Sequence, residues 1–264
     1  MSNRICRRSA AAVVWVALLA AQPAHSQPRG GFSDEQIARE GTRIASGDRV
    51  ELFQYRVTAD PALLPIAEAA LPRMEALLGL KLDEATLGRK IRIYVSAPTG
   101  VSHVWRGYDL PRDPRAIVFL NPRVAREAIN GTNATYAHEM THLLTWRFHS
   151  HTLREGIADY VALTLHPGAG VGPNPRGYGT PPAVTEDIEK YLGTTKSPPA
   201  AVEEDLQFRQ GYYFASYRFV KFLIDRKGIP VFLELYNSRN PESEYPRLYG
   251  ASRAELVLAA REGH

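Results

Sequence analysis

Two histidines and a glutamate lie close together near the middle of the chain. His138, Glu139 and His142 form the pattern His-Glu-x-x-His. On a helix, residues four apart point only about 40° away from one another, so both imidazoles leave the same face. Two such imidazoles can bind a zinc ion, and the glutamate beside them can hold a water molecule. The pattern therefore predicts a zinc site. The alternative is two histidines on a helix surface with a glutamate between them by chance.

A catalytic zinc ion usually has three protein ligands and one open position, so a third ligand is needed. Glu155 is the strongest candidate, and Asp159 follows it four residues later on the same face of a second predicted helix. Glu155 would bind zinc, while Asp159 would accept the far N–H of a ligand histidine and hold its tautomer. A solvated, charged helix face is the alternative for this pair. His149 and His151, where the first helix should end, are the other ligand candidates.

The elements that must position these residues follow from hydrophobic periodicity. Apolar and β-branched runs predict strands at 50–57, 90–95 and 116–120, after a loose segment or short helix at 27–47. Apolar residues at helical spacing predict helices at 61–79, 133–147, 152–165, 211–227, 229–237 and 252–262. Pro72 should kink or shorten the first of these. Residues 167–183 are dense in glycine and proline and are predicted to form a loop.

The order of these elements predicts an α+β fold. Strands come first and helices afterwards, so a small, mostly N-terminal β-sheet should pack on a helical half that carries the His-Glu-x-x-His helix. Gly156 would let the two site helices approach closely. Residues 27–264 are expected to form a single domain.

The motifs resemble those of the gluzincin metallopeptidases, which include thermolysin. His-Glu-Met-Thr-His at 138–142, then twelve residues, then Glu-Gly-Ile-Ala-Asp at 155–159 is similar to the pattern of the compact members of that group. The resemblance covers residues 116–228 well. It implies a thermolysin-like catalytic domain with zinc ligands His138, His142 and Glu155. It also implies that Glu139 is the general base and that Asp159 supports the ligand histidine His138.

The aromatic segment at 211–223 extends the resemblance. Gluzincins commonly place a tyrosine or histidine opposite the zinc ion to bind the developing oxyanion. By this match Tyr213 is the first choice, Tyr212 the second and Tyr217 the third, and aromatic core packing is the alternative. The resemblance also implies that a substrate lies antiparallel along an edge strand before the zinc helix, which would be 116–120. A plain core strand is the alternative, which the apolar character of 116–120 equally allows.

Composition and charge limit the other possibilities. The 264 residues are 44% hydrophobic and 23% charged, which is typical of a folded protein. Residues 1–26 carry three arginines, an apolar run and small residues at Ala24 and Ser26. This pattern predicts a signal peptide cleaved after Ser26 and export to the periplasm or the medium. The only cysteine, Cys6, would be removed with it. The remainder has 29 basic and 28 acidic residues, so a nucleic-acid surface is not indicated.

The resemblance implies an exported zinc metallopeptidase with a peptide or protein substrate and no stable membrane insertion after signal cleavage. The Gly-x-Met-Glu-Asn motif of zinc aminopeptidases is absent from the sequence, which argues against a typical aminopeptidase. Two alternatives are a catalytically silent binding or scaffold protein of the same fold and a zinc hydrolase of non-peptide amides or esters.

Overall fold

The computed structural model describes residues 33–86, 88–105 and 116–263. The predicted signal peptide at 1–26 and its cysteine lie outside the described residues. Within the described part of the chain, no helix is both long and apolar enough to span a membrane.

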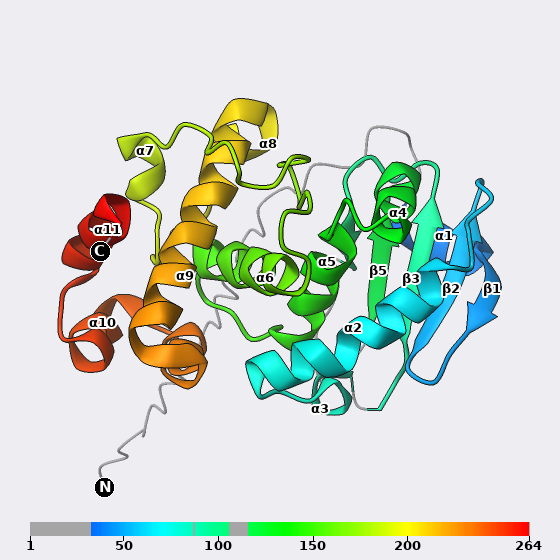
Figure 1. Ribbon diagram of the computed structural model, residues 1–264, viewed down its shortest axis with the longest axis horizontal. Helices are drawn as coiled ribbons and strands as arrows, with labels where there is room; N and C mark the ends of the chain where they lie inside the picture. The colour runs from blue at the N-terminus through cyan, green and yellow to red at the C-terminus, as the bar shows by residue number, and fades with distance from the viewer. Residues whose placement is uncertain (1–32, 87, 106–115, 264) are drawn as a thin grey trace, which may run out of the picture.

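A mixed sheet occupies the N-terminal part of the described chain (Figure 1). Its strands are β1 (Thr42–Ser46), β2 (Val50–Tyr55), β3 (Ile91–Ser96), β4 (His103–Val104) and β5 (Ile117–Leu120). They lie in the order β1-β2-β3-β5-β4. The three central strands, β2, β3 and β5, are parallel, and each outer strand pairs antiparallel with its neighbour. The three predicted strands are therefore the central ones.

The outer strands were not predicted. β1 replaces part of the loose segment expected at 27–47, and a short helix, α1 (Asp34–Glu40), precedes it. β1 is mostly exposed, so it lacks the alternating apolar pattern of a half-buried strand. β4 has only two residues, which is too short for any such pattern.

Helices form the rest of the molecule. After α1 come α2 (Leu63–Leu78), α3 (Leu82–Thr86), α4 (Pro122–Ile129), α5 (Thr135–Leu144), α6 (His151–Leu165), α7 (Glu186–Glu189), α8 (Ala201–Glu204), α9 (Leu206–Tyr236), α10 (Pro241–Tyr249) and α11 (Arg253–Glu262). α2 continues past Pro72, so the expected early end is wrong. Proline has no backbone N–H, so the carbonyl four residues before Pro72 loses its helical hydrogen bond. Pro72 is exposed, so water can reach this side of the helix and replace that bond. The predicted break between 227 and 229 is confirmed, because Gly228 takes a positive φ of 81° inside α9.

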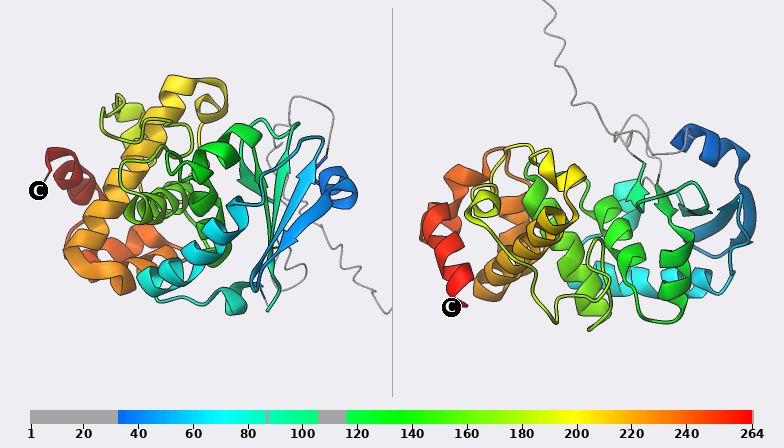
Figure 2. Two further views of the ribbon diagram at one scale, coloured as in Figure 1. Left: turned by 45° about the vertical axis from the view of Figure 1, so that its right-hand side comes forward. Right: turned by 90° about the horizontal axis from the view of Figure 1, so that it is seen from above.

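The sheet lies between two unequal hydrophobic layers. Val50, Leu52, Ile93 and Val118 belong to the main core, which continues into the helices. On the opposite face, a smaller cluster joins α1 to the sheet through Ile37, Tyr55, Tyr94, Trp105, Ile117 and Phe119. Figure 2 shows the helical half beyond one face of the sheet. The predicted α+β arrangement is thus observed, with a sheet beside a helical half.

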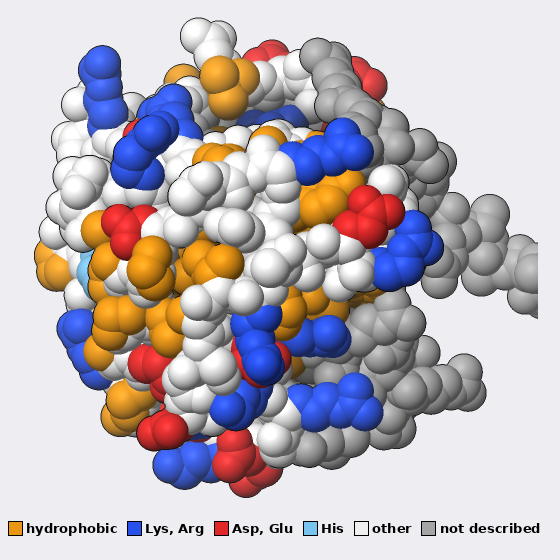
Figure 3. All heavy atoms as spheres, turned by 90° about the vertical axis from the view of Figure 1, so that its right-hand side faces the viewer, with side chains coloured by type: hydrophobic (Ala, Val, Ile, Leu, Met, Phe, Trp, Pro, Cys, Tyr) orange, Lys and Arg blue, Asp and Glu red, His pale blue; other side chains and the backbone are white. Residues whose placement is uncertain are grey.

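The far end of the sheet is a mixed surface. Figure 3 views this end and shows basic and acidic side chains interspersed with hydrophobic ones on its described part.

Two central helices connect the sheet to the long helix α9. All ten residues of α5 are buried, since α5 lies between the sheet and α6. α6 then packs against α9 at Gly156, where an added Cβ would lie 2.4 Å from the Ser216 carbonyl oxygen. The glycine therefore permits a close approach to α9 rather than the expected approach between α5 and α6.

A partly buried ion pair ties the start of β2 to α2, and it makes a testable contribution to stability. The Glu75 carboxylate accepts two hydrogen bonds from Arg49, at 2.6 and 2.9 Å, and one from the Leu82 backbone N–H at 2.7 Å. The Arg49 hydrogen bonds lower the pKa of Glu75 from 4.5 to about 2. Because the folded-state pKa is depressed, the stabilisation is present above pH 4.5 and is lost as pH falls toward 2.

We expect Glu75→Gln to lower the free energy of unfolding at pH 7 by about 2 kcal/mol, a value below the full shift because Arg49 is partly exposed to solvent. The difference between wild type and variant should shrink at pH 3. Urea unfolding of both proteins at the two pH values measures this. A difference that is the same at both pH values would contradict the assignment of the effect to ionised Glu75.

Candidate metal centre

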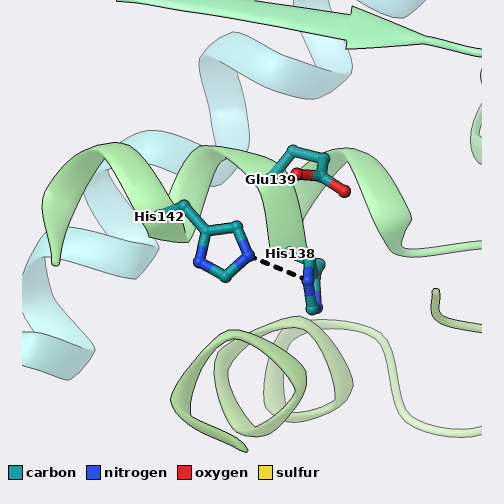
Figure 4. A group of neighbouring side chains, drawn as sticks. All are labelled: His138, Glu139 and His142. Atoms are coloured by element: carbon teal, nitrogen blue, oxygen red, sulfur yellow. Dashed lines mark hydrogen bonds between the residues drawn. The ribbon is translucent and has the colours of Figure 1, made fainter. Parts of the chain in front are cut away.

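The two motif histidines face each other from one side of α5 (Figure 4). His138 and His142 are one helical turn apart, and their Nε2 atoms are separated by 3.0 Å. The rings meet edge to face, with centroids 4.6 Å apart. Glu139 leaves α5 on another side, as Figure 4 also shows. The predicted common face of the histidines is therefore observed.

Glu155 reaches the same point from α6. Its Oε2 atom lies 3.3 Å from His138 Nε2 and 3.5 Å from His142 Nε2. All three side chains are buried. In a tetrahedral zinc site with bonds of about 2.0–2.1 Å, neighbouring ligand atoms are about 3.4 Å apart. The three atoms have the chemical types of zinc ligands, and their separations of 3.0–3.5 Å lie close to this value, so these residues fit the ion.

A second carboxylate lies near the same pair of histidines. His138, Glu139 and His142 each offer a ligand atom within 4.8 Å of the others. This is a looser group than the one that includes Glu155, whose oxygen is within 3.5 Å of both imidazole nitrogens. Of the two carboxylates, Glu155 is therefore the better placed to share a metal ion with both histidines.

The other two ligand candidates, His149 and His151, lie in and just after the connection between α5 and α6. His149 is exposed in the connection between α5 and α6. His151 begins α6, and its Nε2 atom is 3.5 Å from Glu155 Oε1 while its Nδ1 atom is 3.1 Å from the Tyr212 hydroxyl. His151 thus contacts Glu155 Oε1, whereas Glu155 Oε2 is the oxygen near His138 and His142.

Asp159 makes the contact expected from its spacing. His138 Nδ1 donates a hydrogen bond of 2.7 Å to Asp159 Oδ1, which leaves Nε2 free to bind a metal. Asp159 Oδ2 accepts a short hydrogen bond from the Tyr178 hydroxyl. Sequence reasoning missed Tyr178, because a tyrosine in a glycine- and proline-rich loop carries no spacing signal. By contrast, His142 Nδ1 is buried without a hydrogen-bond partner among the described residues.

The protonation states of two candidate ligands suit a cation. Burial opposes ionisation of Glu155, but the Arg154 charge and hydrogen bonds from His138 and His142 outweigh it, so the pKa of this carboxyl lies well below its usual range. Burial and the nearby Arg154 charge lower the pKa of His142 to about 3. Near neutral pH these two groups are a carboxylate and a neutral imidazole. For His138, burial is outweighed by hydrogen bonds to Asp159 and Glu155, which raise its pKa. Metal binding would therefore displace a proton from His138.

Of the three predicted tyrosines, Tyr213 is the one beside the histidine pair. Its ring stacks on His138 with centroids 6.1 Å apart. Burial, together with the charges of Glu155 and Glu139, raises the pKa of Tyr213 well above its ordinary value. The Tyr212 hydroxyl contacts His151, and the Tyr217 ring stacks on Tyr178. Tyr213 therefore has a ring beside His138 and a hydroxyl group that stays protonated near neutral pH.

The edge strand next to α5 differs from the expected one. β5 lies between β3 and β4, so 116–120 is an interior strand. Among the described strands, the edge beside α5 is β4, which pairs antiparallel with β5 and contacts α5. The expectation was wrong because a two-residue strand gives no sequence signal, whereas its apolar neighbour does.

A scan of the chain against protein-family models, a search of curated proteins and a search of solved structures find no match.

Proposed function

We propose that this protein is an exported zinc metallopeptidase of the gluzincin type, with a thermolysin-like catalytic core. The observation that carries the proposal is the convergence of His138 Nε2, His142 Nε2 and Glu155 Oε2 within 3.5 Å, with Glu139 on the same helix. Export with cleavage after Ser26 follows from the composition of the first 26 residues.

Zinc, when bound, supplies a Lewis acid that acidifies water and polarises a carbonyl group. His138, His142 and Glu155 hold the ion. Glu139 takes a proton from the attacking water and delivers it to the leaving amine. Burial raises the pKa of Glu139, which makes its carboxylate a better base than an exposed glutamate. Asp159 keeps His138 in the tautomer that binds metal through Nε2.

The substrate in this proposal is a peptide in extended conformation. β4 is an edge strand in contact with α5, so its backbone can pair with a peptide next to Glu139. Backbone pairing recognises any extended chain, which suits a peptidase rather than a hydrolase of small esters.

Tyr213 donates a hydrogen bond to the oxyanion that forms from the scissile carbonyl. We expect Tyr213→Phe to lower kcat about 100-fold with little change in KM, because the bond strengthens only as charge develops. Zinc content should not change. Tyr217→Phe, one helical turn further along α9, is the matched control and should retain activity. Equal kcat in the Tyr213 variant and wild type would remove Tyr213 from the mechanism.

Peptide hydrolysis by the mature chain tests the whole proposal. Purified residues 27–264 are incubated with a mixed peptide library and with model esters, with and without zinc and a chelator. We expect cleavage of internal peptide bonds that the chelator abolishes and added zinc restores. Zinc binding without cleavage of any peptide would refute the peptidase proposal. Ester hydrolysis would then indicate a different hydrolase, and its absence a scaffold protein.

A further inference from the structure

The segment between α6 and α7 is hydrogen-bonded both to the start of α5 and to α9. We call residues 167–183 the strap. The Gly170 carbonyl accepts a hydrogen bond of 2.7 Å from the Ala134 N–H, and the Gly170 N–H donates one of 2.9 Å to the Thr132 carbonyl. Ala134 and Thr132 lie just before α5. The Gly172 N–H also donates to Thr135 Oγ1, in the first turn of α5, at 3.0 Å. The strap is thus bound to the start of the helix that carries the histidines.

The strap also contacts α9 close to Tyr213. The Gln210 side chain donates to the Pro173 carbonyl at 3.0 Å. Gly172 lies against the Tyr213 ring, since an added Cβ would be 3.6 Å from that ring. Further along the strap, the Tyr178 ring stacks on Tyr217 and tilts against Phe214, each with centroids 5.0 Å apart. The strap therefore joins the two helices that bear His138 and Tyr213.

One side chain of the strap reaches the shell around the candidate metal. The Tyr178 hydroxyl donates to Asp159 Oδ2 and accepts from Asn174 Nδ2 at 3.3 Å. Asp159 Oδ1 accepts from His138 Nδ1. Asp159 is fully buried, so its second oxygen would lose a required donor if Tyr178 withdrew. A continuous chain of hydrogen bonds thus runs from the strap to a candidate ligand.

We propose that the strap is coupled to metal binding through Tyr178, a positioning residue that holds Asp159 and, through it, His138. The proposal rests on the metal-binding part of the proposed function but not on peptide hydrolysis. Coupling between two sites is reciprocal: if the seated strap strengthens metal binding, bound metal must hold the strap in place to the same degree. The strap would then stay seated more of the time when zinc is bound than when it is not.

A double-mutant cycle tests the first direction of this coupling. Zinc affinity is measured by chelator competition for wild type, Tyr178→Phe, Asp159→Asn and the double variant. We expect Tyr178→Phe to weaken binding about tenfold, within the range for lost partners of a ligand histidine. It should add little once Asp159 is replaced, because the hydroxyl acts through that carboxylate. Tyr217→Phe, in the same ring stack, should bind zinc like wild type. Unchanged affinity in Tyr178→Phe, or fully additive losses, would overturn the proposal.

Limited trypsin digestion tests the reverse direction and needs only the native chain. Arg176 is exposed in the strap, and Arg239, exposed between α9 and α10, provides an internal control. At zinc concentrations about 100 times Kd, we expect cleavage after Arg176 to slow about tenfold, the same factor as the expected loss of affinity, while cleavage after Arg239 is unchanged. Zinc that binds without protecting Arg176 would refute the coupling alone. A native chain that binds no zinc would refute the proposed function itself.

Discussion

Glu139→Gln is expected to reduce peptide hydrolysis about 1000-fold and to leave the bound zinc in place. General-base catalysis contributes about 100- to 10,000-fold, and glutamine cannot accept the proton of the attacking water. The metal should remain because, in the proposed site, the two histidine nitrogens and Glu155 Oε2 are the three ligands. Zinc content, measured by atomic absorption, and kcat on a cleaved peptide give the two readouts.

The same variant distinguishes the two carboxylates near the histidines. If Glu139 were the third ligand, its replacement would remove the metal together with the activity. Glu204→Gln, at an exposed position on α8, is the control for replacing a glutamate and should match wild type in both readouts. Retained activity in Glu139→Gln would refute the general-base role.

Glu155→Gln is expected to give the opposite pattern, with loss of zinc as the primary effect. Loss of an outer partner of a ligand already costs about 10- to 100-fold in affinity, so loss of an anionic ligand should cost more than 100-fold. The amide keeps the size of the side chain, and therefore the helices should keep their packing. Zinc affinity by chelator competition measures the effect, and circular dichroism verifies the fold.

Excess zinc separates two explanations of an inactive Glu155 variant. Partial recovery of activity at high zinc concentration would be expected if only affinity is lost. Wild-type affinity in Glu155→Gln would place the third ligand elsewhere, and His151, whose Nε2 atom is 3.5 Å from Glu155 Oε1, would be tested next.

The central elements of the fold were predictable because their signals are local. The three parallel strands are rich in apolar, β-branched and aromatic residues, and α5, α6 and the break at Gly228 follow from helical spacing and from glycine. The edges of the sheet were not predictable. β1 is exposed and β4 is very short, so neither leaves an apolar pattern, and strand order depends on how the connections pack.

The amino-acid sequence by itself determined which side chains share a helix face. His138 and His142, and likewise Glu155 and Asp159, are four residues apart, and helical geometry then leaves little freedom. Only the tertiary structure decided that Glu155 Oε2 meets both imidazoles and that β4 is the edge strand beside α5. It also decided that Tyr178 completes the contacts of Asp159. These contacts join separate elements, so they depend on the packing of α6 against α5 and α9, which no local spacing encodes.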